Sequence, residues 1–290
     1  MKHLLKMGDL TPEELTHILD VADKLKADQK AGGTAPLLKG KSVALMFSKN
    51  STRTRTSFEV GVYQLGGLGN YMNAATELQS GRGEPLKDTA RVLGRYYDCV
   101  VWRTYRQRDL EEFAELAGVP VINGLTNDSH PCQVMGDIMS FIEKRGSIEG
   151  AVVTWIGDAN NVLYSWLYAA SILGFKVHIS APPGYSINPT QVPDNDDCYD
   201  FFLSPEEAAE GADLVTTDNW RSCGYDENQA KRQSKSARWQ VNETVMKAAK
   251  PDALFMHCLP AFRGQEVSSE VIDGPQSVVC LLYTSDAADE

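Results

Sequence analysis

The residues best suited to chemistry form a short polar segment, Ser51-Thr52-Arg53-Thr54-Arg55. Its hydroxyl and guanidinium groups suit a phosphate, because one guanidinium can bind two oxygens at once. The segment follows an apolar run at 41–47 that predicts a buried strand, and apolar side chains recur at helical spacing over 57–65. Free N–H groups at the start of that helix favour an anion. These features predict a phosphate site, with a Ser- and Thr-rich helix cap beside surface arginines as the alternative.

A second candidate cation, Arg103, ends the apolar run 99–103, which predicts another buried strand. In open α/β sheets, ligand-binding groups gather at the carboxyl ends of the strands. We therefore expect Arg103 to lie near Arg53, with an ordinary ion pair at the end of a strand as the alternative. The glycine-rich residues 79–85 predict a mobile loop rather than a helix or strand.

The elements that must position these residues alternate between strand and helix patterns. A second series of strand, helix and strand patterns occupies residues 151–180. A chain of 290 residues favours two domains on size alone. The fold class that follows is α/β, with two doubly wound parallel-sheet domains at residues 1–145 and 146–279, joined by connecting helices.

The composition is that of an ordinary globular protein and limits its partners. Hydrophobic residues make up 42% of the chain and charged residues 23%. The net charge of −11 argues against nucleic acid as a partner, because the phosphate backbone would repel it. The six cysteines show no C-x-x-C pair and no zinc spacing, so we expect reduced thiols and no metal. Neither an apolar leader nor a run of membrane-spanning length is evident, and we expect a cytoplasmic protein.

Four strings carry a family resemblance. They are S-T-R-T-R-T-S-F-E at 51–59, H-P-C-Q at 130–133, W-I-G-D-A-N-N at 155–161 and H-C-L-P at 257–260. By the order and approximate spacing of these strings, residues 1–279 resemble the aspartate/ornithine carbamoyltransferase family. A further string, D-N-W-R-S-C-G, is similar to the D-x-W-x-S-M-G of its ornithine-specific members, with Cys223 in place of the methionine. The resemblance implies a carbamoyltransferase.

The reaction implied is transfer of the carbamoyl group of carbamoyl phosphate to the δ-amino group of L-ornithine. The products would be L-citrulline and phosphate, as in arginine biosynthesis. Phosphate is a good leaving group, so the reaction needs positioning and charge neutralisation but no cofactor or metal. Two alternatives stay open: another amine acceptor, such as putrescine or a modified ornithine, and a ligand-binding chain without catalysis. The resemblance also implies a homotrimer with sites at the subunit interfaces.

The resemblance assigns roles to the residues that match the family's motifs. The implied carbamoyl-phosphate ligands are Ser51, Thr52, Arg53, Thr54, Gln79, Arg103, His130 and Gln133. The implied ornithine ligands are Asn161, Asp218, Ser222, Cys223, Cys258 and Leu259. The implied catalytic residues are Arg103 and His130, which would polarise the carbonyl group, and Cys258, which would lie near the δ-nitrogen. Gln79 would reach the site of a neighbouring subunit.

The last residues, 280–290, depart from this pattern. Their string, C-L-L-Y-T-S-D-A-A-D-E, resembles a translated sequencing adapter rather than the family's acidic linker and final helix. We therefore expect these residues to be a non-native tail and the chain to be truncated at its C-terminus.

Overall fold

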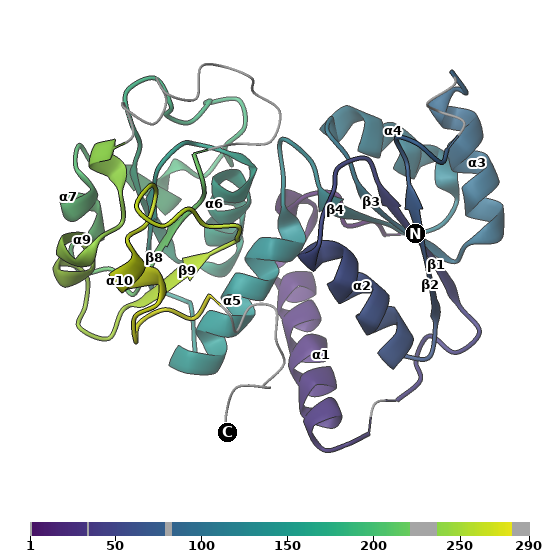
Figure 1. Cartoon of the computed structure of the whole chain (residues 1–290), viewed down its shortest axis with the longest axis horizontal. Helices are drawn as coiled ribbons and strands as arrows, with labels where there is room; N and C mark the ends of the chain where they lie inside the picture. Colours follow the sequence, from purple (N-terminus) through teal and green to yellow (C-terminus); the bar gives the residue numbers. More distant parts are fainter. Residues whose placement is uncertain (1, 34, 79–82, 221–236, 280–290) are drawn as a thin grey trace. The chain divides into compact units, whose positions relative to one another are not determined.

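The computed structural model describes residues 2–33, 35–78, 83–220 and 237–279 (Figure 1). The chain divides into two compact units, Met1–Cys132 and Gln133–Glu290, and each contains its own parallel sheet. The fold class predicted from the sequence, α/β with two doubly wound parallel-sheet domains, is thereby confirmed. The predicted domain boundary at residues 145 and 146 stays a prediction.

The first unit contains a four-stranded sheet in the order β2-β1-β3-β4, with all strands parallel. The chain moves from β1 to β2 in one direction and then returns across β1 to β3 and β4. Right-handed crossovers therefore place α2 on one face of the sheet and α3 and α4 on the other. The elements are α1 (Pro12–Lys30), β1 (Ser42–Phe47), α2 (Arg53–Gln64), β2 (Leu68–Asn73), α3 (Leu86–Tyr96), β3 (Cys99–Arg103), α4 (Gln107–Ala117), β4 (Val121–Leu125) and the start of α5 (Pro131–Arg145).

Both faces of the first sheet are covered, as expected for parallel strands. Along β1, Val43 and Leu45 pack in a cluster with Val62 of α2. The alternate residue Met46 packs in a second cluster with Phe113 of α4. Successive side chains of a strand point to opposite faces, so a nearly continuous apolar run supplies both cores.

Helix α1 begins at a capping signal that is visible in the sequence, Thr11-Pro12-Glu13-Glu14. Thr11 caps it and Pro12 occupies its first position. The Thr11 hydroxyl accepts from the backbone N–H of Glu14 at 3.3 Å, and the Glu14 carboxylate accepts from the Thr11 N–H at 2.9 Å. This reciprocal pair is a capping box, which satisfies backbone donors that the helix itself cannot.

The second unit contains a five-stranded parallel sheet in the order β7-β6-β5-β8-β9. Right-handed crossovers place α6 on one face and α7 on the other, because the chain reverses direction after β7. Residues of α7, α9 and α10 share one core cluster with Phe255 of β9. The elements are β5 (Val152–Ile156), α6 (Asn161–Leu173), β6 (Lys176–Ser180), β7 (Tyr199–Phe201), α7 (Pro205–Ala209), β8 (Leu214–Thr217), α9 (Glu243–Ala248), β9 (Leu254–His257) and α10 (Ser269–Ile272).

The two strand orders fix where each unit should bind a ligand. In a doubly wound sheet, ligands bind beyond the carboxyl ends of the strands, where the strand order reverses direction. This switch point lies between β1 and β3 in the first unit and between β5 and β8 in the second. Within the described residues, no helix combines the length and apolar character needed to cross a membrane.

Candidate active site

The polar segment lies at the switch point of the first sheet. Strand β1 ends at Phe47 and helix α2 begins at Arg53, with Thr52 in the N-cap position. Arg103 ends the neighbouring strand β3, and its Nη1 atom donates to the Thr54 hydroxyl at 3.4 Å. The structure therefore brings Arg103 together with residues of the segment 51–54, at a helix N-terminus that favours an anion.

The two arginines of the segment have different surroundings. Arg53 is half-buried in the first turn of α2. The Arg55 guanidinium lies 3.5 Å from the centre of the Tyr71 ring, and its Nε atom lies 3.2 Å from the Glu59 carboxylate. An aromatic face and a carboxylate together hold Arg55 within its own unit.

A network of hydrogen bonds shapes the turn that carries His130. The Thr126 hydroxyl donates to the Gln107 amide oxygen at 2.7 Å and accepts from the Ser129 N–H at 3.1 Å. The Asn123 amide donates to the Leu5 carbonyl oxygen at 2.7 Å. Because Asn123, Thr126 and Ser129 are themselves buried, these bonds fix the backbone just before His130.

The His130 imidazole is only 8% exposed. Burial lowers the pKa of His130 to about 3, with further contributions from the positive charges of Arg103 and Lys49. The ring is therefore neutral near pH 7, and it can donate one hydrogen bond without bringing a charge. A neutral donor beside Arg103 suits an oxygen that gains negative charge during a reaction.

Lys49 is a functional candidate that the sequence interpretation missed. Its side chain is 7% exposed, and its Nζ atom donates to the Asn127 amide oxygen at 2.6 Å. The same Nζ atom lies 4.4 Å from the centre of the Tyr105 ring. A buried cation close enough to lower the pKa of His130 adds positive potential where an anion would bind. The sequence signal that could have identified Lys49 is its position two residues before Ser51.

Gln133 begins the second unit and lies on α5. Its amide nitrogen donates to the Asp137 carboxyl oxygen at 2.8 Å, one helical turn further on. Burial raises the pKa of Asp137 to about 7, and the Gln133 hydrogen bond opposes that shift. Gln79, the remaining residue predicted to bind carbamoyl phosphate, lies outside the described residues.

In the second unit, Asn160 connects the start of α6 to Asp218. Its side-chain oxygen accepts from the N–H groups of Val162 and Leu163, at 2.9 and 3.2 Å, and so caps the helix. Its amide nitrogen donates to Asp218 Oδ2 at 2.7 Å. Asn161, which the sequence singled out, is the first residue of α6. The sequence interpretation missed Asn160, although an asparagine before an apolar helix is a recognisable cap signal.

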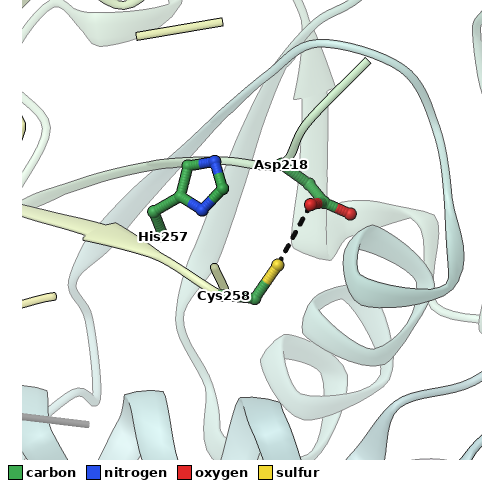
Figure 2. A group of neighbouring side chains, drawn as sticks. All are labelled: Asp218, His257 and Cys258. Carbon is green, nitrogen blue, oxygen red and sulfur yellow. Dashed lines mark hydrogen bonds between the residues drawn. The ribbon is translucent and has the colours of Figure 1, made fainter. Parts of the chain in front are cut away.

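Asp218 and Cys258 meet at the carboxyl edge of the second sheet (Figure 2). Cys258 Sγ donates to Asp218 Oδ1 at 3.1 Å, and the N–H of Asn219 donates to the same oxygen at 2.6 Å. Leu259 follows in a left-handed conformation, with φ of 51°. Ser222 and Cys223, also predicted to bind the amino-acid substrate, lie outside the described residues.

Asp218, His257 and Cys258 offer possible metal-ligand atoms within 4.8 Å of one another. The His257 Nδ1 atom, however, already accepts from the N–H of Leu259 at 2.9 Å, and its Nε2 atom lies 3.3 Å from the Glu266 carboxylate. A metal at His257 would have to replace one of these contacts. We therefore interpret the group as a hydrogen-bonded network and not as a metal site.

The two sets of residues suit two kinds of ligand. In the first unit, hydroxyl groups, guanidinium groups and a helix N-terminus suit a phosphate. A neutral imidazole beside Arg103 suits a carbonyl oxygen. In the second unit, the Asp218 carboxylate suits an ammonium group, and the Leu259 carbonyl and Cys258 thiol can contact an amine.

Comparison with known proteins matches both halves of the chain. The carbamoyl-P binding domain of aspartate/ornithine carbamoyltransferase matches residues 2–143, and the Asp/Orn binding domain matches residues 149–281. Ornithine carbamoyltransferase from Ralstonia nicotianae is 51% identical over 280 residues, which cover 96% of this chain and 91% of that protein.

Two solved structures are similar throughout. Ornithine carbamoyltransferase from Pyrococcus furiosus has a TM-score of 0.93 and 43% identity, covering 98% of this chain and 93% of its own. The enzyme from Burkholderia thailandensis has a TM-score of 0.90 and 46% identity, covering 98% of this chain and 94% of its own.

Proposed function

The chain belongs to the aspartate/ornithine carbamoyltransferase family, and we propose on this basis that it transfers a carbamoyl group from carbamoyl phosphate to L-ornithine. The bond between the carbamoyl carbon and the δ-nitrogen of ornithine forms, and the bond from that carbon to the phosphate oxygen breaks. Phosphate leaves with the electron pair and the nitrogen releases a proton, so the products are L-citrulline and phosphate. The names of the relatives, at about 50% identity, support ornithine as the acceptor.

The observation that carries the proposal is the meeting of Arg103 and Thr54 at the first switch point. Ser51, Thr52, Arg53 and Thr54 hold the phosphate there, and Lys49 adds a buried positive charge. Arg53 makes the main ionic contact, because its planar guanidinium can bind two phosphate oxygens together. Gln79 of a neighbouring subunit completes this set.

Arg103 and His130 act on the carbamoyl group itself. When the δ-nitrogen attacks, the carbonyl oxygen gains negative charge, and a guanidinium and an N–H donor stabilise it. The lowered pKa of His130 keeps its ring neutral, so it acts as a hydrogen-bond donor throughout the neutral pH range. Gln133, oriented by Asp137, accepts from the carbamoyl NH₂ group.

The second unit orients the acceptor. Asp218 binds the α-ammonium group of ornithine, and Asn161, with Ser222 and Cys223, binds the rest of its amino-acid end. Cys258 and the Leu259 carbonyl contact the δ-nitrogen. The hydrogen bond between Cys258 and Asp218 supports this division, because it brings the two ends of the acceptor site into one network.

Further features of the proposal follow from the family. We place the enzyme in the cytoplasm and in arginine biosynthesis, and we infer a homotrimer with closed cyclic symmetry, which suits a loop donated to a neighbour. The carbamoyl-phosphate domain spans residues 1–145 and the ornithine domain 146–279. A second candidate acceptor, putrescine or a modified ornithine, is favoured only by Cys223, which replaces the methionine of ornithine-specific members.

Citrulline formation by the purified chain tests the proposal. We expect turnover with carbamoyl phosphate and ornithine and little with putrescine; the reverse preference would contradict it. Arg53→Ala should raise the KM for carbamoyl phosphate at least about tenfold, because a contact to a charged group contributes about 1.5–3 kcal/mol. Arg53→Lys should be nearly as poor. Arg106→Ala, at an exposed arginine paired with Asp109, is the matched control and should leave both KM values unchanged.

A further inference from the structure

His257 and Glu266 form a buried pair that the proposed chemistry does not use. Both side chains are completely buried, and His257 Nε2 lies 3.3 Å from Glu266 Oε1. The same carboxylate oxygen accepts from the backbone N–H of Phe262 at 2.5 Å. A polar side chain at this depth needs partners, because burying a polar group without a hydrogen bond is destabilising.

The hydrogen bond on the other side of the ring assigns its proton. His257 Nδ1 accepts from the N–H of Leu259 at 2.9 Å, so Nδ1 carries no proton. The proton of the neutral ring therefore lies on Nε2, which is 3.3 Å from the Glu266 carboxylate but is not aligned to donate a hydrogen bond to it. The contact from a side-chain acceptor to the N–H two residues later has the connectivity of an Asx turn, made here by a histidine.

The hydrogen bond from the Leu259 N–H to His257 Nδ1 encloses the turn that carries the Cys258 thiol and the Leu259 carbonyl, the groups proposed to contact the acceptor amine. Leu259 adopts φ of 51°, a left-handed conformation that a residue with a Cβ atom rarely occupies without support. Between the two ends of the bond lies Cys258, whose thiol donates to Asp218 (Figure 2). The direction of the thiol and of the Leu259 carbonyl therefore depends on the bond that His257 accepts.

We propose that Glu266 and His257 form a buried clamp that sets the conformation of the turn at Cys258 and Leu259. Both are positioning residues: Glu266 contacts the Nε2 side of the His257 ring, and His257 holds the Leu259 N–H. The inference rests on the proposed function in one respect, that this turn contacts the acceptor amine.

Two substitutions of His257 separate positioning from simple core packing. The side-chain oxygen of asparagine can take the place of Nδ1 and accept from the Leu259 N–H, as in an Asx turn. Glutamine reaches toward the place of Nε2 and loses that acceptor. We expect His257→Gln to raise the KM for ornithine about tenfold, and His257→Asn to raise it less than about threefold. The KM for carbamoyl phosphate should stay unchanged in both.

The matched control is His178→Gln, at the other histidine among the described residues of this unit. His178 Nδ1 contacts the Ala208 carbonyl, and its ring lies 4.6 Å from that of Phe202, in the same unit. This variant should leave the KM for ornithine unchanged. Equal increases for His257→Asn and His257→Gln would overturn the proposal, because a role limited to packing predicts no rescue by asparagine.

Alkylation of Cys258 by iodoacetamide, followed by peptide mass spectrometry, gives a readout that needs no turnover. His257→Gln should change the alkylation rate of Cys258 at least about threefold, and His257→Asn should restore it. An unchanged rate in His257→Gln would overturn the clamp even if the enzyme uses ornithine. Conversely, a chain that shows the expected rates but does not form citrulline would contradict only the proposed function.

If His257→Gln does not fold, two variants of Glu266 test the same proposal. Glu266→Gln keeps the side-chain length and an oxygen that can lie against His257 Nε2 and accept from the Phe262 N–H. Glu266→Asp shortens the side chain and withdraws that acceptor. We expect Glu266→Asp to change the Cys258 alkylation rate and Glu266→Gln to preserve it, and identical rates in the two would overturn the proposal.

Discussion

Asn160 and Asn242 cap two helices of the second unit with the same geometry, which permits a controlled test of how Asp218 is held. Asn160 accepts from the first-turn N–H groups of α6 at 2.9 and 3.2 Å. Asn242 accepts from those of α9 at the same two distances. Within the described part of the chain, Asn160 also donates to a carboxylate, that of Asp218, at 2.7 Å, and Asn242 donates to none. Asn160→Ala therefore removes a cap and an Asp218 contact, and Asn242→Ala removes a cap alone.

The expected magnitudes differ accordingly. Loss of an asparagine cap costs about 1 kcal/mol of stability, so both variants should lose at least that amount, and Asn160→Ala should lose more because it also removes the Asp218 contact. A hydrogen bond to a charged group contributes about 1.5–3 kcal/mol. If that energy serves to orient Asp218 toward the substrate ammonium, Asn160→Ala should raise the KM for ornithine by roughly one to two orders of magnitude. The KM for carbamoyl phosphate should stay constant in both variants.

Steady-state citrulline formation, with each substrate varied while the other is saturating, measures the two KM values. Urea unfolding of the same preparations measures the shared loss of stability. The reasoning is refuted if Asn160→Ala and Asn242→Ala change the KM for ornithine equally, because the effect would then follow from helix stability. It is also refuted if Asn160→Ala raises the KM values of both substrates together.

Two further predictions concern stability. Gly94→Ala should disrupt the packing of α3 on α4, because a Cβ there would lie 1.6 Å from the Ala117 carbonyl oxygen. Gly61→Ala, whose Cβ would meet no atom within 4 Å, should instead stabilise α2 by about 0.5–1 kcal/mol, and thermal unfolding of both variants is the measurement. Asp137→Asn should make the free energy of unfolding rise more steeply with pH between about pH 4 and 6, by up to about 1.4 kcal/mol per pH unit. Urea titrations at several pH values measure this slope.

The sign of the last prediction depends on two groups with opposite effects. Burial raises the pKa of Asp137 from 3.8 to about 7, so between these values the folded chain holds a proton that the unfolded chain has lost, and stability falls as pH rises. Burial lowers the pKa of His130 from 6.5 to about 3, so the unfolded chain alone takes up a proton there, and stability falls as pH drops. Asparagine removes the first effect and leaves the second. An unchanged slope in Asp137→Asn would contradict the assignment.

The elements that could be predicted are those whose information is local. The capping box of Thr11 and Glu14 marks the start of α1 in the sequence alone, because all its atoms belong to four consecutive residues. The apolar runs that became β1 and β3 were long enough to indicate buried strands. Helix α4 was overlooked, although Leu110, Phe113, Ala114 and Ala117 are buried at helical spacing. The three-residue strand β7 carries no comparable pattern, and it pairs with β6 across more than twenty residues of sequence.

The sequence by itself determined the fold class and the family, and it supplied the predicted site residues, because motifs at strand ends are local and specific. Only the tertiary structure decided which partners surround them. The bond between Asn160 and Asp218 joins residues 58 apart in the chain, and the pairing of His257 with Glu266 depends on how a loop returns to the sheet. Burial also decided that His130 is neutral, since the pKa of a group depends on the solvent and charges excluded or brought near by folding. No local pattern carries that information, because these contacts exist only once the strands have paired.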